Sequence, residues 1–157
     1  MGAWSSDSKT DVASMDADDF RSNEQSVTVD AAGEFKIEFV DQAGEVSVLK
    51  GAAPLLEGES IDATVMRKAA LVSFLEKQIT RAKEEGTLFS LHMKATMMKV
   101  SHPIVFGHAV TVFYKDLWEK HGTLFEELGV EPNNGLGSVY EKIANLPRSL
   151  HDEIIED

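Results

Sequence analysis

The sequence predicts a mixed α/β fold, in which a short antiparallel β meander is followed by a long helix, a strand and a helical C-terminal half. Three observations predict this fold class. Apolar and polar residues alternate in short runs between residues 26 and 50. Apolar residues recur every three or four positions between residues 62 and 85, and again after residue 103. Period two is typical of strands and period 3.6 of helices, so the chain mixes both.

Composition limits the class of protein. With 157 residues, of which 43% are hydrophobic, we expect one domain over residues 1–157 with its own core. The net charge of -12 argues against general binding to nucleic acid or to an anionic membrane surface. The absence of cysteine excludes disulfides and thiolate metal sites. No apolar run could span a bilayer and no signal peptide is recognisable, so we expect a cytoplasmic protein.

The N-terminal third predicts loops and then strands. Residues 1–25 are loop-rich, and we expect at most one helical turn in them. Residues 27–29, 35–40 and 46–49 alternate in the manner of strands, with turn residues between them. Short glycine-containing connections are typical of an antiparallel meander, so we expect one β meander over residues 26–50 with a structural role.

A long helix is expected over residues 62–85. Asp62 is a suitable N-cap because its carboxylate can accept hydrogen bonds from the amides of the first turn. Gly86 can adopt the left-handed conformation that closes a helix. The apolar stripe comprises Val65, Ala69, Val72, Leu75, Ile79 and Ala82.

A strand is expected over residues 87–94, packed between two long helices. Phe89 and Met93 would lie on its apolar face, and its polar face would end in His92 and Lys94. Ligands of open α/β sheets bind at the carboxyl ends of strands, so Lys94 is a candidate site residue. A solvated edge strand explains the same spacing, and spacing alone favours that alternative.

The C-terminal half predicts helices. One begins near Pro103, capped by Ser101 or His102, and ends near residue 121. His108 lies within this apolar helix and is more typical of a core or boundary histidine than of a ligand. Further short helices are expected over residues 124–128, closed by glycine, and over residues 136–145 and 148–155.

Few chemical motifs are present. Residues 134–137 contain two glycines but lack the spacing of a phosphate-binding loop, and no nucleophile elbow or zincin pair occurs. The acidic pairs at 84–85 and 126–127 are typical of solvated helix faces. A lysine becomes a general base when burial or nearby cations lower its pKa, and His92 or Lys99 could supply such cations for Lys94. The residues therefore indicate a candidate acid/base lysine without identifying a substrate.

Several longer segments resemble one known family. They are Met1-Gly2-Ala3-Trp4-Ser5, Asp7-Ser8-Lys9, Gly58-Glu59, Ile61-Asp62, His92-Met93-Lys94-Ala95-Thr96-Met97-Met98-Lys99-Val100-Ser101 and Asn133-Asn134-Gly135-Leu136-Gly137. In this order, and across nearly the whole chain, they closely resemble the monomeric NADP-dependent isocitrate dehydrogenases. One departure is His102, where that family usually has aspartate before the proline.

The resemblance implies a fold, a reaction and one site residue. It implies part of an isocitrate/isopropylmalate dehydrogenase-like fold, from the large domain of a monomeric enzyme of the tricarboxylic acid cycle or glyoxylate bypass. The implied reaction is oxidative decarboxylation of isocitrate to 2-oxoglutarate with NADPH formation, using Mg²⁺ or Mn²⁺. The catalytic lysine of the family falls on Lys94. The substrate-binding segment, the metal ligands and the NADP contacts of the family lie outside residues 1–157, so this chain would be inactive alone and would need those missing segments.

Two other functions are considered. A stand-alone, non-catalytic acidic interaction module derived from the same fold would be favoured by an exposed apolar patch. A pocket at Lys94 that is open to missing segments would favour the dehydrogenase. A small enzyme using His92 and Lys94 without a metal has little support, since no second acid/base partner stands at a defined spacing.

Overall fold

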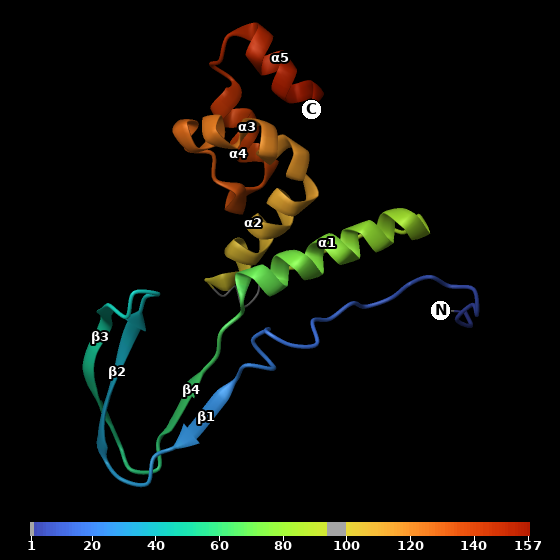
Figure 1. The fold of residues 1–157 in the computed structure, drawn as a ribbon. Helices are drawn as coiled ribbons and strands as arrows, with labels where there is room; N and C mark the ends of the chain where they lie inside the picture. The colour runs from blue at the N-terminus through green and yellow to red at the C-terminus, as the bar shows by residue number, and fades with distance from the viewer. Residues whose placement is uncertain (1, 94–99) are drawn as a thin grey trace. The chain divides into compact units, whose positions relative to one another are not determined.

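The computed structural model describes residues 2–93 and 100–157, and confirms a mixed α/β fold. The chain forms two compact units. One comprises residues 16–67 and contains all strands of the described part of the chain. The other combines the first fifteen residues with residues 68–157 and contains the helices (Figure 1).

The strands form a nested antiparallel hairpin, which we call the β arm (residues 25–63). β1 (Gln25–Thr28) pairs with β4 (Ser60–Ala63), and further along the arm β2 (Gly33–Val40) pairs with β3 (Val46–Leu55). The predicted three-stranded meander is therefore wrong. The turn residues 30–32 do not reverse the chain, because Val29 bonds across the arm to Glu59 and Gly58 (2.9 Å each).

The tip of the β arm is the turn predicted at residues 41–44. The Asp41 carboxylate accepts hydrogen bonds from the amides of Ala43 and Glu45, both at 2.8 Å. Gly44 has φ 84°, a conformation that costs glycine little. Asp41 and Gly44 thus form the turn that was predicted at residues 41–44, because aspartate accepts backbone hydrogen bonds there and glycine tolerates the positive φ.

The long helix α1 (Lys68–Glu85) begins six residues later than predicted. Asp62 is not its N-cap, because this residue lies in β4 opposite Ser26 of β1. The predicted end is confirmed: Gly86 has φ 64°, and the Thr87 amide bonds back to the Ala82 carbonyl at 2.9 Å. This closing turn directs the chain back along α1.

Residues 87–93 have no regular secondary structure, so the predicted strand is wrong over these residues. In the described part of the chain, the strands pair only within the β arm, and residues 87–93 pair with none of them. The predicted sidedness nevertheless holds. Phe89, Leu91 and Met93 are half-buried, whereas Ser90 and His92 are exposed.

The helix predicted from near Pro103 to near residue 121 is instead two helices, and the separate short helix predicted over residues 124–128 is wrong, because those residues are the end of the second one. α2 (Ser101–Phe113) and α3 (Lys115–Leu128) meet at Tyr114, which leaves helical geometry (φ -106°, ψ 42°). The two helices bury different faces: α2 contacts α1 and the short helix η2 (Pro132–Asn134), whereas α3 buries Leu117, His121 and Phe125. Gly129 closes α3 with φ 67°, as predicted.

The core lies among the C-terminal helices. α4 (Leu136–Ile143) and α5 (Arg148–Glu156) match the predicted short helices within two residues. The Trp118 ring meets Phe125 edge-to-face, with centroids 5.3 Å apart. Of the helices in residues 2–93 and 100–157, none is long and apolar enough to cross a membrane. The buried cluster comprises Leu117, Phe125, Val130, Val139, Ile143 and Ile154.

Candidate functional site

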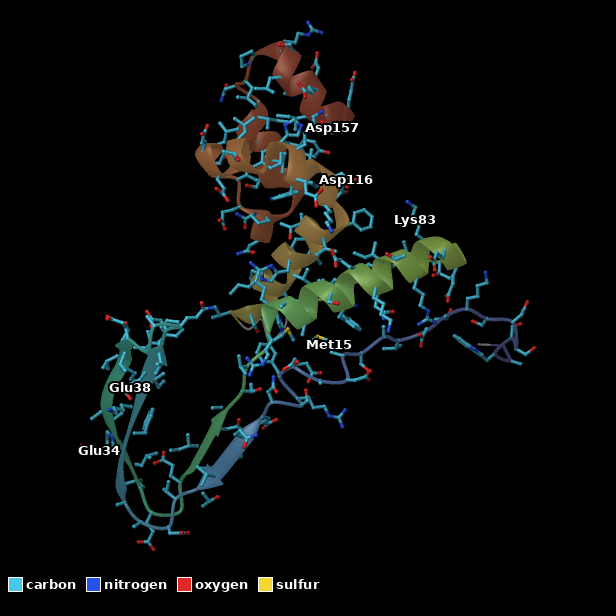
Figure 2. The ribbon with its side chains drawn as sticks, in the orientation of Figure 1. Met15, Glu34, Glu38, Lys83, Asp116 and Asp157 are labelled. Carbon is cyan, nitrogen blue, oxygen red and sulfur yellow. The ribbon has the colours of Figure 1, made fainter. Side chains whose placement is uncertain are left out.

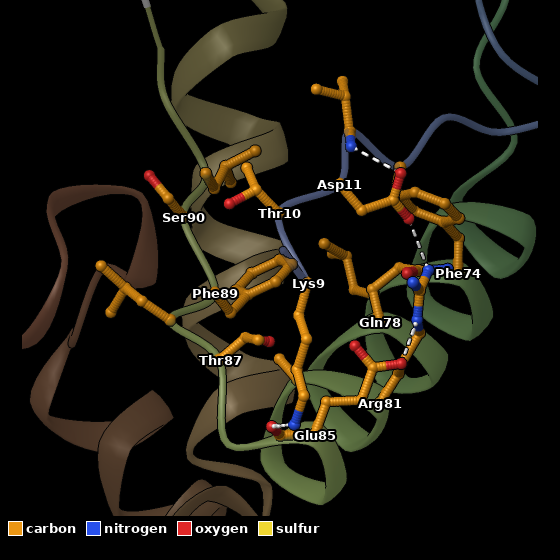
Figure 3. A pocket seen from close by; sticks show the side chains of 16 residues that line it. Lys9, Thr10, Asp11, Phe74, Gln78, Arg81, Glu85, Thr87, Phe89 and Ser90 are labelled. Atoms are coloured by element: carbon orange, nitrogen blue, oxygen red, sulfur yellow. Dashed lines mark hydrogen bonds and ion pairs between the residues drawn. The ribbon is translucent and has the colours of Figure 1, made fainter. Parts of the chain in front are cut away.

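A cavity of about 670 Å³ lies beside the segment that leads to Lys94 (Figure 3). Three stretches of the helical unit line it: residues 9–13, one face of α1 and residues 87–91. Phe74 and Phe89 give it apolar walls, while Lys9, Arg81 and Glu85 supply charge. The closing turn at Gly86 creates this arrangement, because it lays residues 87–91 alongside α1.

Arg81 ties the N-terminal segment to α1. Its Nη1 donates to Asp11 at 2.6 Å, and its Nε donates to Glu85 at 2.9 Å (Figure 3). The hydrogen bond from Arg81 holds the pKa of Asp11 below its ordinary value. Hydrogen bonds to Glu85 and Asp11 raise the pKa of Arg81 in turn. Its positive charge is therefore already matched by two carboxylates.

Lys9 is also engaged. Its ammonium donates to the carbonyl of Glu85 at 2.9 Å, at the negative end of the α1 dipole. Lys9 and Arg81 are the cations among the described residues that line the cavity. Both have partners, so the cavity offers an acidic substrate no ready cation from the described residues.

The predicted catalytic residue Lys94 lies outside the described residues, as does Lys99. His92, which was predicted to share the polar face of a strand with Lys94, is exposed on a segment without regular structure. The structure thus describes the approach to Lys94 from residue 87 to residue 93. The role of Lys94 stays a prediction.

The start of α2 differs from the predicted cap. The N-cap residue is Val100, without a side-chain hydrogen bond, and Ser101 and His102 are already helical. His102 Nδ1 is buried and has no hydrogen-bond partner among the described residues. His108 is half-buried, and its pKa is lowered by burial and then by the charge of Lys68. Its half-buried position agrees with the predicted boundary role.

A second polar cluster, which the sequence analysis missed, joins α3 to the end of α5. His121 is buried, and its Nε2 lies 2.8 Å from the Asp157 carboxylate, while candidate ligand atoms of His121, Glu153 and Asp157 fall within 4.8 Å of one another. The Lys120 ammonium lies 3.0 Å from Glu153 and 2.6 Å from Asp157. Hydrogen bonds from Lys120 and His121 lower the pKa of Asp157.

This cluster does not fit the divalent ion that the family resemblance implies. Mg²⁺ and Mn²⁺ prefer oxygen ligands, whereas here an ammonium already bridges the two carboxylates beside a buried imidazole. NADP also lacks a fit among the described residues, because both cavity cations already have partners and residues 134–137 form the η2–α4 junction. The described residues therefore support no reaction step that uses a divalent metal ion or NADP.

Comparisons with known proteins cover the whole chain. The family model of monomeric isocitrate dehydrogenase matches residues 1–157. The chain is 57% identical to isocitrate dehydrogenase (NADP) 2 of Colwellia maris and 54% identical to that of Mycobacterium tuberculosis. It is 46% identical to isocitrate dehydrogenase (NADP) of Azotobacter vinelandii. Each comparison covers 100% of this chain and 21% of the relative, so the chain spans about a fifth of their length. This chain belongs to the monomeric isocitrate dehydrogenase family.

Proposed function

We propose that these residues form part of an NADP-dependent isocitrate dehydrogenase that converts isocitrate to 2-oxoglutarate and forms NADPH. The observation that carries the proposal is the family match over residues 1–157, together with relatives of 46–57% identity that are named as NADP isocitrate dehydrogenases. The activity belongs to a longer polypeptide, since these relatives are about five times as long as this chain.

Lys94 is the proposed catalytic residue of this segment. The support is the resemblance of His92 to Ser101 to the family's lysine segment. An ammonium would attract the carboxylates of isocitrate, and a lysine with a lowered pKa can accept and return a proton. The chain carries a net charge of -12, so such an attraction must act locally.

The finer expectations belong to the same proposal. Residues 1–157 as a whole would be part of the large domain of a monomeric, cytoplasmic enzyme of the tricarboxylic acid cycle or glyoxylate bypass. The divalent ion, Mg²⁺ or Mn²⁺, would polarise the substrate oxygens from ligands outside this chain. NADP would likewise be held by residues outside it, and neither a nucleic acid nor a membrane would be a partner.

The alternative, a non-catalytic interaction module, has one observation in its favour. Apolar side chains of the β arm, such as Phe39 and Val48, are exposed. The enzyme reading is preferred because a longer polypeptide accounts for the same exposure without a separate partner.

The test places these 157 residues in an enzyme of full length. They replace the matching segment of the Colwellia maris dehydrogenase, and NADPH formation from isocitrate is followed by absorbance. We expect the chimera to be active and Lys94→Met to lower kcat by about one hundred- to ten-thousand-fold, the usual effect of an acid/base residue. The 157-residue chain alone should form no NADPH.

The matched control is Lys83→Met, which removes an exposed lysine that points away from the last turn of α1 (Figure 2). This variant should keep the activity of the chimera. Equal activity of the Lys94→Met and Lys83→Met chimeras would show that Lys94 is not catalytic. NADPH formation by the isolated chain that is lost in Lys94→Met would refute the need for other segments.

A further inference from the structure

The outer half of the β arm, which we call the arm tip (residues 33–55), exposes apolar side chains on one face. Residues paired directly across two antiparallel strands share a face, and Val40 lies opposite Val46. Val48 follows two residues along β3, on the same face. These three side chains are 57–61% exposed. Within residues 16–67, no described residue covers this face.

The opposite face of the arm tip is apolar too. Phe35, Ile37 and Phe39 alternate along β2. The two register shifts beside Ile37 place the extra residues on β3, so β2 keeps its alternation and the three side chains point to one side. Phe35 is half-buried, with the ammonium of Lys50 5.6 Å from its ring centroid. Ile37 and Phe39 are 46% and 56% exposed. Both faces of one two-stranded ribbon therefore present large apolar side chains.

The edges of the arm tip are available for pairing as well. Among the described strands, β2 and β3 pair only with each other, so each has one outer edge with backbone donors and acceptors. A single two-stranded ribbon is at best marginally stable in water. Figure 2 shows Glu34 and Glu38 on this ribbon, and Lys36 pairs with Glu38 at 2.6 Å. Such charges keep an edge soluble but do not cover its apolar faces.

Three observations decide what covers the arm tip. The net charge of -12 and the apolar surface oppose nucleic acid and anionic lipid. The family is described as monomeric, which opposes a second copy. The relatives extend far beyond the matched residues, because the chain covers 21% of their length. The same polypeptide can therefore supply the cover.

We propose that a strand from outside residues 1–157 of the same polypeptide adds to an outer edge of the arm tip and packs apolar side chains against its faces. Strand addition satisfies the edge amides, and alternate side chains of the added strand meet the exposed valines or aromatic rings. This inference follows from family membership and chain length. It does not depend on the role of Lys94.

Hydrogen exchange measured by mass spectrometry tests this proposal. Peptides from residues 33–55 are compared between the 157-residue chain and the Colwellia maris chimera described above. We expect exchange in the arm tip to slow by at least about ten-fold in the chimera, because covered strands open less often. Phe39→Ser in the chimera should restore fast exchange in the arm tip, while peptides from α3 keep their protection.

Lys36→Ser is the matched control, since it changes an exposed polar side chain on the same strand and should leave the protection of the chimera in place. Phe39→Leu should retain protection, which separates lost apolar contact from misfolding. Equal exchange in the chain and the chimera would overturn the proposal. Slow exchange of the arm tip in the isolated chain would also overturn the proposal. If light scattering then shows a dimer, a second copy covers the arm tip; if it shows a monomer, the helical unit does. Inactivity of the chimera would bear on the proposed function alone, because exchange is measured without turnover.

Discussion

Replacing Gly107 by alanine should weaken the packing of η2 on α2. A Cβ at this buried helical position would clash with Asn133 Oδ1 and lie 3.0 Å from the backbone nitrogen of Asn133. The Asn133 side chain can rotate away. The backbone of η2 can yield only if it shifts, so the strain is not fully relieved.

The two opposing magnitudes can be compared. Extra atoms in a packed site cost about 1–3 kcal/mol. Alanine in a helix interior is favoured over glycine by about 0.5–1 kcal/mol. Because the backbone contact remains after Asn133 rotates, we expect the packing cost to exceed the helical gain, with a net loss of roughly 1–2 kcal/mol in the free energy of unfolding.

Urea unfolding followed by circular dichroism at 222 nm measures this loss as a lower midpoint at unchanged slope. Gly122→Ala in α3 is the matched control, since nothing lies within 4 Å of its added Cβ and the variant should be stabilised. Adding Asn133→Ala to Gly107→Ala should recover part of the loss. If Gly107→Ala raises the midpoint as much as Gly122→Ala does, the close approach of η2 to α2 is refuted.

Two further predictions concern the cluster between α3 and α5. Since the folded pKa of Asp157 lies below its ordinary value, this carboxylate stabilises the fold above about pH 4, and the stabilisation disappears as pH falls through the folded pKa. Asp157→Asn should therefore lower the melting temperature at pH 7, and this difference should shrink as the pH falls below about 4; a difference that stays constant as the pH falls would rule out a role for the Asp157 carboxylate in the contacts with Lys120 and His121. The Lys120 ammonium bridges the carboxylates of this cluster, so Mn²⁺ should not bind there. The melting temperature of the metal-free chain should therefore stay the same when Mn²⁺ is added and when excess EDTA follows. A melting temperature raised by Mn²⁺ and restored by EDTA would show that the cluster is a metal site.

Local chemistry explains the parts of the fold that were predicted. Gly86 and Gly129 end their helices because each adopts a left-handed conformation that other residues resist. Asp41 and Gly44 form the arm turn through side-chain and backbone bonds within five residues. These signals are local, so they can be identified without knowing the tertiary structure.

Contacts between distant residues explain what was missed. Ser26 and Asp62 pair in β1 and β4, which replaced the predicted N-cap with a strand. Tyr114 divides the predicted helix because α2 and α3 bury faces against different neighbours, and no breaker residue marks that position. Residues 30–32 were predicted to reverse the chain, but Val29 pairs with Gly58 and Glu59, so the chain continues along the arm through these residues.

The candidate site shows the same division. The segment around Lys94 was found through its resemblance to a family, whereas spacing alone favoured a solvated edge strand. The Arg81 contact with Asp11 spans 70 residues, and that of His121 with Asp157 spans 36. Neither pair has a sequence signal, because each depends on how helices and the N-terminal segment pack.

The central claim is that these residues work within a longer dehydrogenase. The intact mass of the native polypeptide that carries the Lys94 segment, measured from source material, tests it most directly. We expect a mass about five times the 17.2 kDa of this chain, since the chain covers 21% of its relatives. A mass of 17.2 kDa would contradict the account and favour the free-standing, non-catalytic module.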